Sequence, residues 1–146
     1  MEGAIFACPA EWPLPEGILR LTEPAELSGR EWPLLALTVS GVRRLLAEPV
    51  RCQVLLVPGD CPREMLSLLA AERVVTYGLS ARDSITLSSL REPVLCVQRT
   101  LPRPDGAVVE PQEFPLPDLP GQAEELLPLL GLRLLQMPLT DGTFFW

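Results

Sequence analysis

The sequence contains no histidine, no lysine and no asparagine, so all 12 of its basic residues are arginines. Without lysine there is no lysine for a phosphate-binding loop, no Schiff base and no lysine general base. Without histidine there is no Ser-His or Cys-His nucleophile pair and no imidazole ligand for a metal ion. We therefore expect that the chain is not a conventional enzyme, and a thiol or carboxylate enzyme is the alternative that these absences leave open.

Positive charge is also scarce and scattered. The chain has a formal net charge of −7, with 19 acidic against 12 basic residues, and a pI near 4.6. Such a surface repels phosphate backbones, and the largest arginine cluster is the pair Arg43 and Arg44. This balance predicts that nucleic acid is not a partner.

Long apolar runs are missing as well. The longest, Leu126 to Met137, is shorter than the roughly 20 residues that a membrane helix needs. It is also interrupted by Pro128, Gly131, Arg133 and Gln136. The first twenty residues carry three glutamates and no basic start, which is not the pattern of a secretory signal. These features predict a cytoplasmic protein that does not enter the membrane.

Four cysteines are present, Cys8, Cys52, Cys61 and Cys96, but no Cys-x-x-Cys motif. Their spacing suits neither a zinc site nor a redox pair. We expect reduced thiols that serve as small apolar residues, with no metal and no cofactor.

Residues 1–146 are long enough for one domain with one core, and we expect a single α/β domain. Apolar runs bounded by proline or glycine predict its strands. In chain order these are Ala4–Cys8, Gly17–Leu21, Leu34–Val39, Gln53–Val57, Arg73–Tyr77, Ser84–Leu90, Val94–Arg99 and Ala107–Phe114. The expected fold is a mainly parallel central sheet with flanking helices and an antiparallel β extension in the second half.

Three longer helices are expected between and after these strands. One runs from Ser40 to Glu48 with Val42, Leu45 and Leu46 on its inner face. A second begins near Pro62, with Asp60 as its N-cap and Met65, Leu68 and Leu69 on its inner face. The third covers Gln122–Met137, kinked or split near Pro128 and Gly131.

The strand–helix–strand pattern from Gln53 to Tyr77 favours a right-handed crossover between parallel strands. The loops after both strands then lie at one sheet edge, where α/β proteins bind ligands. The candidate ligand-binding residues are Gly59, Asp60, Tyr77, Gly78, Arg82 and Asp83. The alternative is that Gly59 only turns the chain, that Asp60 only caps the helix, and that the others are ordinary loop residues.

The stretch from Val54 to Leu90 resembles the later part of the central domain of the Mur ligases, the ATP-dependent amino-acid ligases of peptidoglycan synthesis. The family has an Asn-Ala-Asp-Asp-Pro type turn after a strand and then a Thr-Tyr/Phe-Gly pattern; Val54–Pro62 and Val74–Ser80 stand in those places. Phe114–Gly121 is similar to the family's Leu-Pro-Leu-Pro-Gly segment before a helix. The ATP-binding loop is absent, so the resemblance implies a bacterial scaffold without ligase chemistry, and no catalytic residue carries over.

The leucine-rich C-terminal helix carries more apolar surface than the roughly 100° stripe that packs on one sheet face. We therefore expect a non-catalytic protein that binds a protein partner or a second copy of itself. The predicted interface residues are Leu130, Leu134, Phe144, Phe145 and Trp146. Two alternatives stand: a small-ligand or nucleotide-like binding module that uses the loops named above, and a chain whose extension buries the helix on all sides.

Overall fold

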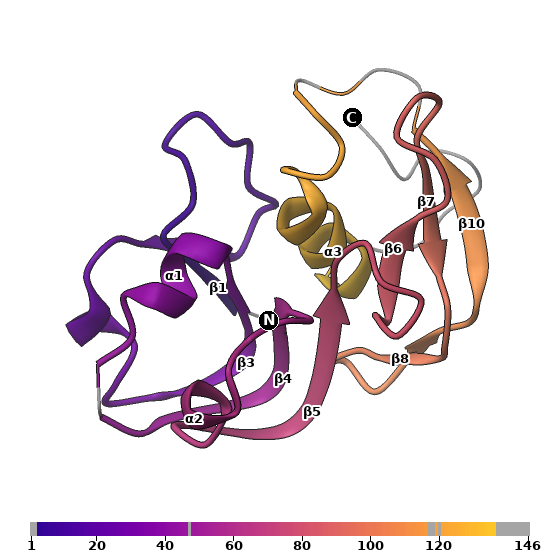
Figure 1. Cartoon of the computed structure of the whole chain (residues 1–146). Helices are drawn as coiled ribbons and strands as arrows, with labels where there is room; N and C mark the ends of the chain where they lie inside the picture. The colour runs from indigo at the N-terminus through magenta and orange to yellow at the C-terminus, as the bar shows by residue number, and fades with distance from the viewer. Residues whose placement is uncertain (1–2, 47, 117–118, 120, 137–146) are drawn as a thin grey trace.

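The computed structural model describes residues 3–46, 48–116, 119 and 121–136, and in them eight strands form one sheet (Figure 1). The strands are β1 (Gly3–Phe6), β2 (Ile18–Leu21), β3 (Glu31–Leu37), β4 (Val50–Pro58), β5 (Leu69–Tyr77), β6 (Ile85–Leu87), β7 (Val94–Val97) and β10 (Gln112–Pro115). They lie in the order β10-β7-β6-β5-β4-β3-β1-β2. In this order the six strands β2, β1, β3, β4, β5 and β6 are mutually parallel. β7 pairs antiparallel with β6, and β10 pairs antiparallel with β7. The predicted α/β fold, a mainly parallel sheet with an antiparallel part, is confirmed.

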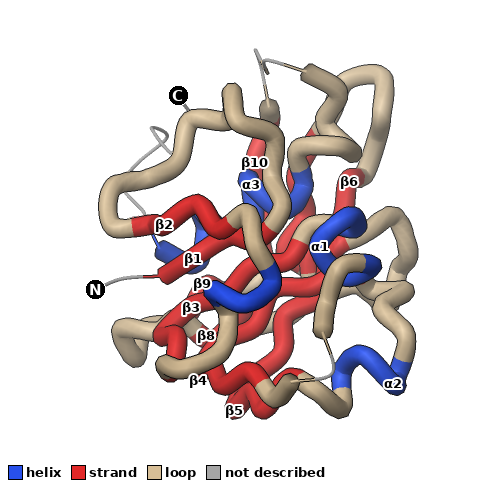
Figure 2. Tube along the Cα trace, turned by 90° about the vertical axis from the view of Figure 1, so that its left-hand side faces the viewer, coloured by secondary structure: helices blue, strands red, loops and turns tan. Residues whose placement is uncertain are grey.

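Each face of the sheet has its own apolar core because successive strand residues point to opposite sides. On one side, Leu34, Leu56 and Val75 pack with helix α3 (Leu127–Gln136). On the other side, Leu35 and Leu55 pack with residues of the short helices α1 (Val39–Arg43) and α2 (Arg63–Leu66). Figure 2 shows α1 and α2 on the side of the sheet away from α3. The 3-10 turn η1 (Pro24–Glu26) precedes β3.

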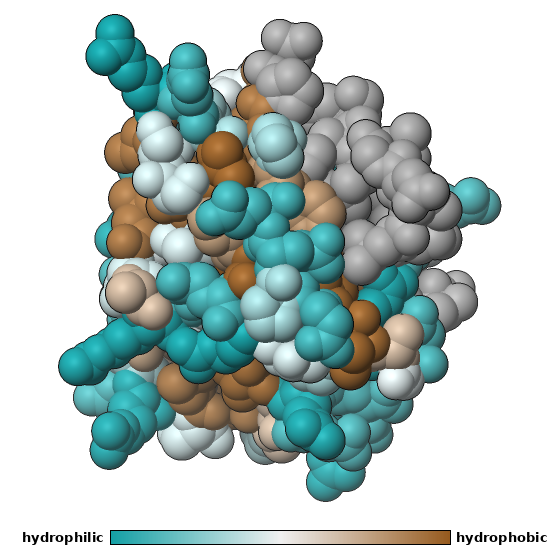
Figure 3. All heavy atoms as spheres, turned by 90° about the vertical axis from the view of Figure 1, so that its right-hand side faces the viewer, coloured by the Kyte–Doolittle hydropathy of each residue, from teal (hydrophilic) through white to brown (hydrophobic). Residues whose placement is uncertain are grey.

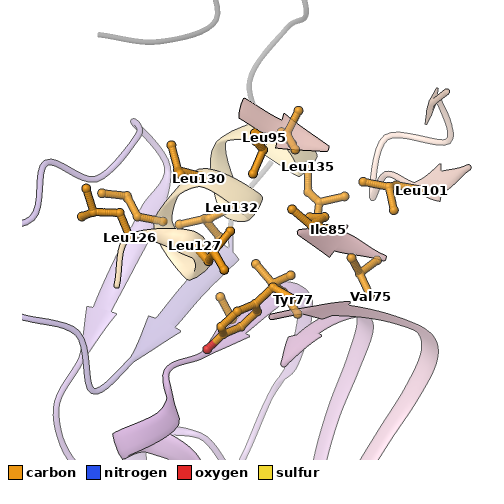
Figure 4. Close-up of a cluster of buried hydrophobic side chains, with 14 of the residues drawn as sticks. Val75, Tyr77, Ile85, Leu95, Leu101, Leu126, Leu127, Leu130, Leu132 and Leu135 are labelled. Carbon is orange, nitrogen blue, oxygen red and sulfur yellow. The ribbon is translucent and has the colours of Figure 1, made fainter. Parts of the chain in front are cut away.

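Helix α3 is apolar on all sides and is enclosed by the rest of the chain. Its leucines contact strands on the sheet, as Figure 4 shows for several of them beside Val75 and Ile85. The leucines at 126, 127, 129, 130, 132, 134 and 135 are all at most 4% exposed. The buried cluster around the helix combines parallel strands with residues of the second half such as Ile85, Leu95 and Leu101, so the chain itself buries the excess apolar surface, which is the alternative weighed for this helix.

The helix expected over Gln122–Met137 begins later than predicted: residues 123–126 form turns, and α3 then runs to Gln136 with no break at Gly131. The helix starts at Leu127, so Pro128 lies in its first turn, where the missing N–H would have no partner within the helix. Gly131 faces the sheet, and a Cβ placed there would lie 2.9 Å from Cδ2 of Leu56 and 3.2 Å from Cδ1 of Ile85. Both residues fit an unbroken helix, one by position and one by close packing.

The two shorter helices differ from expectation. Thr38 caps α1, accepting a 3.0 Å hydrogen bond from the Gly41 amide, and the helix ends at Arg43, so Leu46 is 47% exposed rather than on an inner face. Helix α2 has Pro62 at its N-cap position, which excludes the predicted capping role of Asp60. Its last turns are missing because Leu69 pairs with Val50 and already belongs to β5.

The second half of the sheet is only partly antiparallel. β6 pairs with β5 in parallel register, which corrects the expectation that every strand after Gly78 is antiparallel. The predicted strand at Ala107–Phe114 is two strands, β9 (Val108–Val109) and β10. β9 pairs with β8 (Leu101–Pro102) in a separate hairpin whose turn holds Gly106 at φ 88°, as the Asp-Gly dipeptide predicts.

This hairpin also closes the end of α3. Arg103 is 9% exposed, and its Nη1 donates a 2.9 Å hydrogen bond to the carbonyl of Leu134, within the last turn of the helix. Asp105 accepts from the same guanidinium at 3.3 Å. A cation at a helix C-terminus interacts favourably with the helix dipole, so Arg103 both satisfies a free carbonyl and fixes the hairpin against α3.

The surface beyond β10 mixes hydrophilic and apolar side chains, as Figure 3 shows for the side nearest this strand. Several large apolar side chains are about half exposed, at positions distributed along the chain: Leu19, Val39, Leu46, Val74, Leu79, Leu90 and Val108. Within the described residues, no helix has both the length and the hydropathy required to cross a bilayer.

Candidate functional site

A large hollow lies at the carboxyl edge of the parallel strands. Residues that follow β1, β3, β4 and β5 line it, together with the segment that leads into α3. Its volume is about 1410 Å³, above the roughly 300–1,000 Å³ of ordinary small-ligand pockets. This carboxyl-edge cleft occupies the place where open α/β sheets commonly hold ligands.

The structure brings all six predicted ligand-binding residues to this cleft. Gly59 and Asp60 follow β4, Tyr77 ends β5, and the loop after β5 supplies the rest. The complete predicted set is Gly59, Asp60, Tyr77, Gly78, Arg82 and Asp83. Their convergence is the geometry that a parallel β4–α2–β5 unit requires, because both strands end at the same edge.

Asp83 joins the two loops at the cleft floor. The residue is only 5% exposed, and its Oδ2 accepts a 3.0 Å hydrogen bond from the Ser80 amide. A Cβ built on either Gly59 or Gly78 would overlap the Asp83 carboxylate. The two glycines therefore do more than turn the chain: they leave the space that this carboxylate fills.

Side-chain hydrogen bonds hold the strand ends in place around the cleft. The hydroxyl of Tyr77 donates to the carbonyl of Leu37 at 2.7 Å, and its burial raises the pKa of the phenol. Thr38 Oγ1 donates to the carbonyl of Ala7 at 2.8 Å. These bonds connect β5 to β3 and β3 to β1, so the edge is fixed before any ligand arrives.

Arg20 braces the wall formed by the loop after β1. Its guanidinium donates to Sγ of Cys8 at 2.9 Å, to the carbonyl of Trp12 at 2.8 Å and to the carbonyl of Pro9. Ala7, at the start of this loop, has φ 64°, a conformation that costs a non-glycine residue energy. The surrounding hydrogen bonds hold it there, which indicates a loop with a defined shape.

The lining combines apolar and carboxylate groups. Trp12 and Leu127 contribute apolar surface, and Val39 and Leu79, at 48% and 54% exposure, are apolar side chains at its margin. Burial raises the pKa of Cys8 despite the Arg20 contact, so this thiol is a poor nucleophile at neutral pH. Among the described side chains, no three metal-ligating groups lie close enough to hold an ion. Such an arrangement can bind and orient a molecule.

The chain has no significant match among protein-family models, curated proteins or solved structures.

Sequence reasoning missed the wall that comes from the first half of the chain. Glu11, Trp12 and Ser40 line the cleft, and so do Glu124 and Glu125 before α3. That β1 and β3 end beside β4 depends on the strand order, which the local pattern does not contain.

Only two of the five predicted interface residues lie in the part of the chain that the structure describes. Leu130 and Leu134 are fully buried in the core of their own chain. They present no surface to a partner, so their predicted role in an interface is wrong. Phe144, Phe145 and Trp146 lie outside the described residues. Association through that tail stays a prediction, and sedimentation of the full chain beside a version ending at Leu139 tests it.

Proposed function

We propose that this chain is a non-catalytic binding module that holds a small organic ligand in the carboxyl-edge cleft. One observation carries the proposal: the loops after β4 and β5 converge with the loops after β1 and β3 on a single large, partly apolar hollow. Ligand pockets of proteins combine mostly apolar walls with a few fixed polar groups. Trp12 and Leu79 supply the first kind of surface, and the exposed side chains of Asp60 and Arg82 supply the second.

The walls of the cleft are held in place by hydrogen bonds before any ligand binds, which supports a binding function for the cleft. A ligand gains affinity when the groups that receive it are already ordered, because less conformational entropy is lost. The Tyr77–Leu37 and Thr38–Ala7 hydrogen bonds order the strand ends, and Arg20 orders the opposite wall. The chain has no histidine or lysine to serve as a base or nucleophile, and burial raises the pKa of the Cys8 thiol, which supports binding over catalysis.

The same proposal includes a bacterial scaffold of Mur-ligase type that lacks the ligase reaction. It rests on the motifs at Val54–Pro62, Val74–Ser80 and Phe114–Gly121 and on the absent phosphate-binding loop. The interface function predicted from the leucine-rich helix is the less favoured proposal, because α3 is enclosed by its own chain.

A fragment screen followed by thermal melting tests the binding function. We expect several fragments to raise the melting temperature of the wild-type chain, because only the folded state presents the cleft. Leu79→Arg should abolish most of these shifts by placing a long charged side chain at the cleft margin.

Leu90→Arg is the matched control, since Leu90 is 58% exposed, much like Leu79, but does not line this cleft. It should leave the shifts unchanged. Equal shifts in both variants would place the fragments elsewhere, and no stabilising fragment at all would reject the binding function.

A further inference from the structure

The charges around the carboxyl-edge cleft are strongly one-sided. Five carboxylates line it, and the single guanidinium in the described lining belongs to Arg82. The carboxylates are those of Glu11, Asp60, Asp83, Glu124 and Glu125. Carboxylates that share a concave, partly apolar surface repel one another and focus a negative potential into it.

The nearest additional arginine does not offset this potential within the cleft. Arg20 is not among the lining residues, and its donors are directed at Cys8, Pro9 and Trp12. Its guanidinium therefore stabilises the wall of the cleft and is not directed into the interior. An anionic ligand would therefore meet one exposed guanidinium and four exposed carboxylates, with the buried Asp83 carboxylate behind them.

The amides just before the helix that starts at the cleft are already engaged. Free amides at a helix N-terminus attract anions. Here the amides of Glu125 and Leu126 already donate to the carbonyl of Gln122, at 3.1 Å and 3.2 Å, and Pro128 has no amide hydrogen. Two glutamate side chains stand beside these positions, so the approach to α3 is negative as well.

A metal ion does not explain the carboxylates. In the part of the chain that the structure describes, no three of the acidic, thiol or imidazole groups are grouped as a metal site requires. The five carboxylates come from separate parts of the chain, and the same lining includes apolar side chains such as Trp12 and Leu126. A spread of negative charge over an apolar lining suits an organic body that carries positive charge.

We infer that the cleft takes an organic cation, an amine-bearing small molecule with an apolar or aromatic body, rather than a nucleotide or another anion. The inference rests on the proposed binding function and names its ligand class. The ammonium group would be attracted to the carboxylates, and the apolar body would contact Trp12 and Leu79.

Three compounds with one indole body and three charges test this: tryptamine, its neutral analogue tryptophol and the anion indole-3-acetate. Dissociation constants come from amide chemical-shift titrations of the full chain. We expect tryptamine to bind at least about tenfold more tightly than indole-3-acetate, with tryptophol between them and the preference falling as salt is raised.

The variant Glu11→Gln/Glu124→Gln/Glu125→Gln should reduce this preference to about twofold or less. The matched control is Glu31→Gln/Glu72→Gln/Glu92→Gln, which removes the same net charge from exposed positions outside the cleft lining. It should retain the wild-type preference. A preference lost equally in both variants would assign it to the net charge of the protein and overturn the inference.

The outcomes separate the two proposals. If indole-3-acetate binds in the cleft as tightly as tryptamine, the ligand class is wrong while the binding function stands. If no compound of the three perturbs cleft amides at concentrations up to about 10 mM, the ligand class fails here, and the fragment screen decides the binding function.

Discussion

Asp83 is the residue on which the shape of the carboxyl-edge cleft most depends. It occupies the space left by Gly59 and Gly78 and hydrogen-bonds the Ser80 amide, so it holds the loop after β5 against the loop after β4. The sequence predicts Asp83 only as a possible ligand contact. The structure adds a second role, because the carboxylate is almost entirely enclosed by protein.

Gly59→Ala should destabilise the chain by about 1–3 kcal/mol, because the new methyl group overlaps the Asp83 carboxylate. In an Asp83→Ala background the same substitution should cost about 1 kcal/mol less, since the overlapping group is gone. Urea unfolding of the four proteins of this cycle measures the coupling. Gly121→Ala, whose Cβ would lie 3.8 Å from Leu126, is the control; additive costs in the cycle would refute the contact.

Cys52 lies in the core on the α1 and α2 side of the sheet, and its burial makes the stability of the chain depend on pH. The residue is 1% exposed, and desolvation raises its pKa to about 12 from 9.0. The unfolded thiol therefore ionises first, so its contribution to stability is complete below the unfolded pKa and is lost as pH rises toward the folded one. Between about pH 8 and pH 10, unfolding should become easier by about 1 kcal/mol more in wild type than in Cys52→Ala.

Denaturant midpoints of both proteins across this range give the result. Using the difference between them removes the effect of Tyr77 and of the other thiols, which both chains share. Parallel pH profiles for wild type and Cys52→Ala would mean that the thiol ionises as easily in the folded chain as in the unfolded one.

At the scale of elements, the sequence predicted strands better than helices. Buried strands such as Gln53–Val57 are continuous apolar runs, and their length and bounding residues distinguish them. The short helix before β5 was overextended because Leu68 and Leu69 suit a helix face as well as a strand. Pairing of Leu69 with Val50 decided the outcome, and this contact is not local.

Only one side of the candidate site could be predicted from the sequence. The β4–α2–β5 unit places two loops at one edge by handedness alone, so the residues of both loops could be named from the sequence. The opposite wall could not, because β1 and β3 reach that edge through the strand order of the whole sheet. The enclosure of α3 likewise depends on β6 and β7, which lie far from it in the chain.

Helix α3 offers a test of how tightly the element packs. Alanine is favoured over glycine by about 1 kcal/mol inside a helix, whereas overfilling a packed core costs about 1–3 kcal/mol. At Gly131 the second effect should prevail, because the added Cβ would lie 2.9 Å from a fully buried Leu56 methyl group. Gly131→Ala should therefore lower the urea midpoint, and adding Leu56→Val should recover part of the loss; a stabilised Gly131→Ala would show a loosely packed helix.

At the scale of the whole molecule, the charge distribution predicts what the chain rejects. The net charge is −7, and the cleft lining has five carboxylates and one guanidinium among its described residues. A triphosphate needs clustered cationic donors. We expect ATP with magnesium to bind more weakly than about 1 mM and not to be hydrolysed, as measured by calorimetry and phosphate release. A micromolar dissociation constant would contradict this expectation.

The carboxyl-edge cleft as the ligand site is the central claim, and amide chemical-shift mapping of the fragment hits tests it most directly. The 16.1 kDa chain is small enough for each amide to be followed separately. The account predicts that the shifts cluster at Cys8, Gly59, Gly78, Ser80 and Arg82, which belong to three separate loops that meet at the cleft. Shifts that cluster on another surface, such as the strands β7 and β10, or that scatter over the molecule would contradict it.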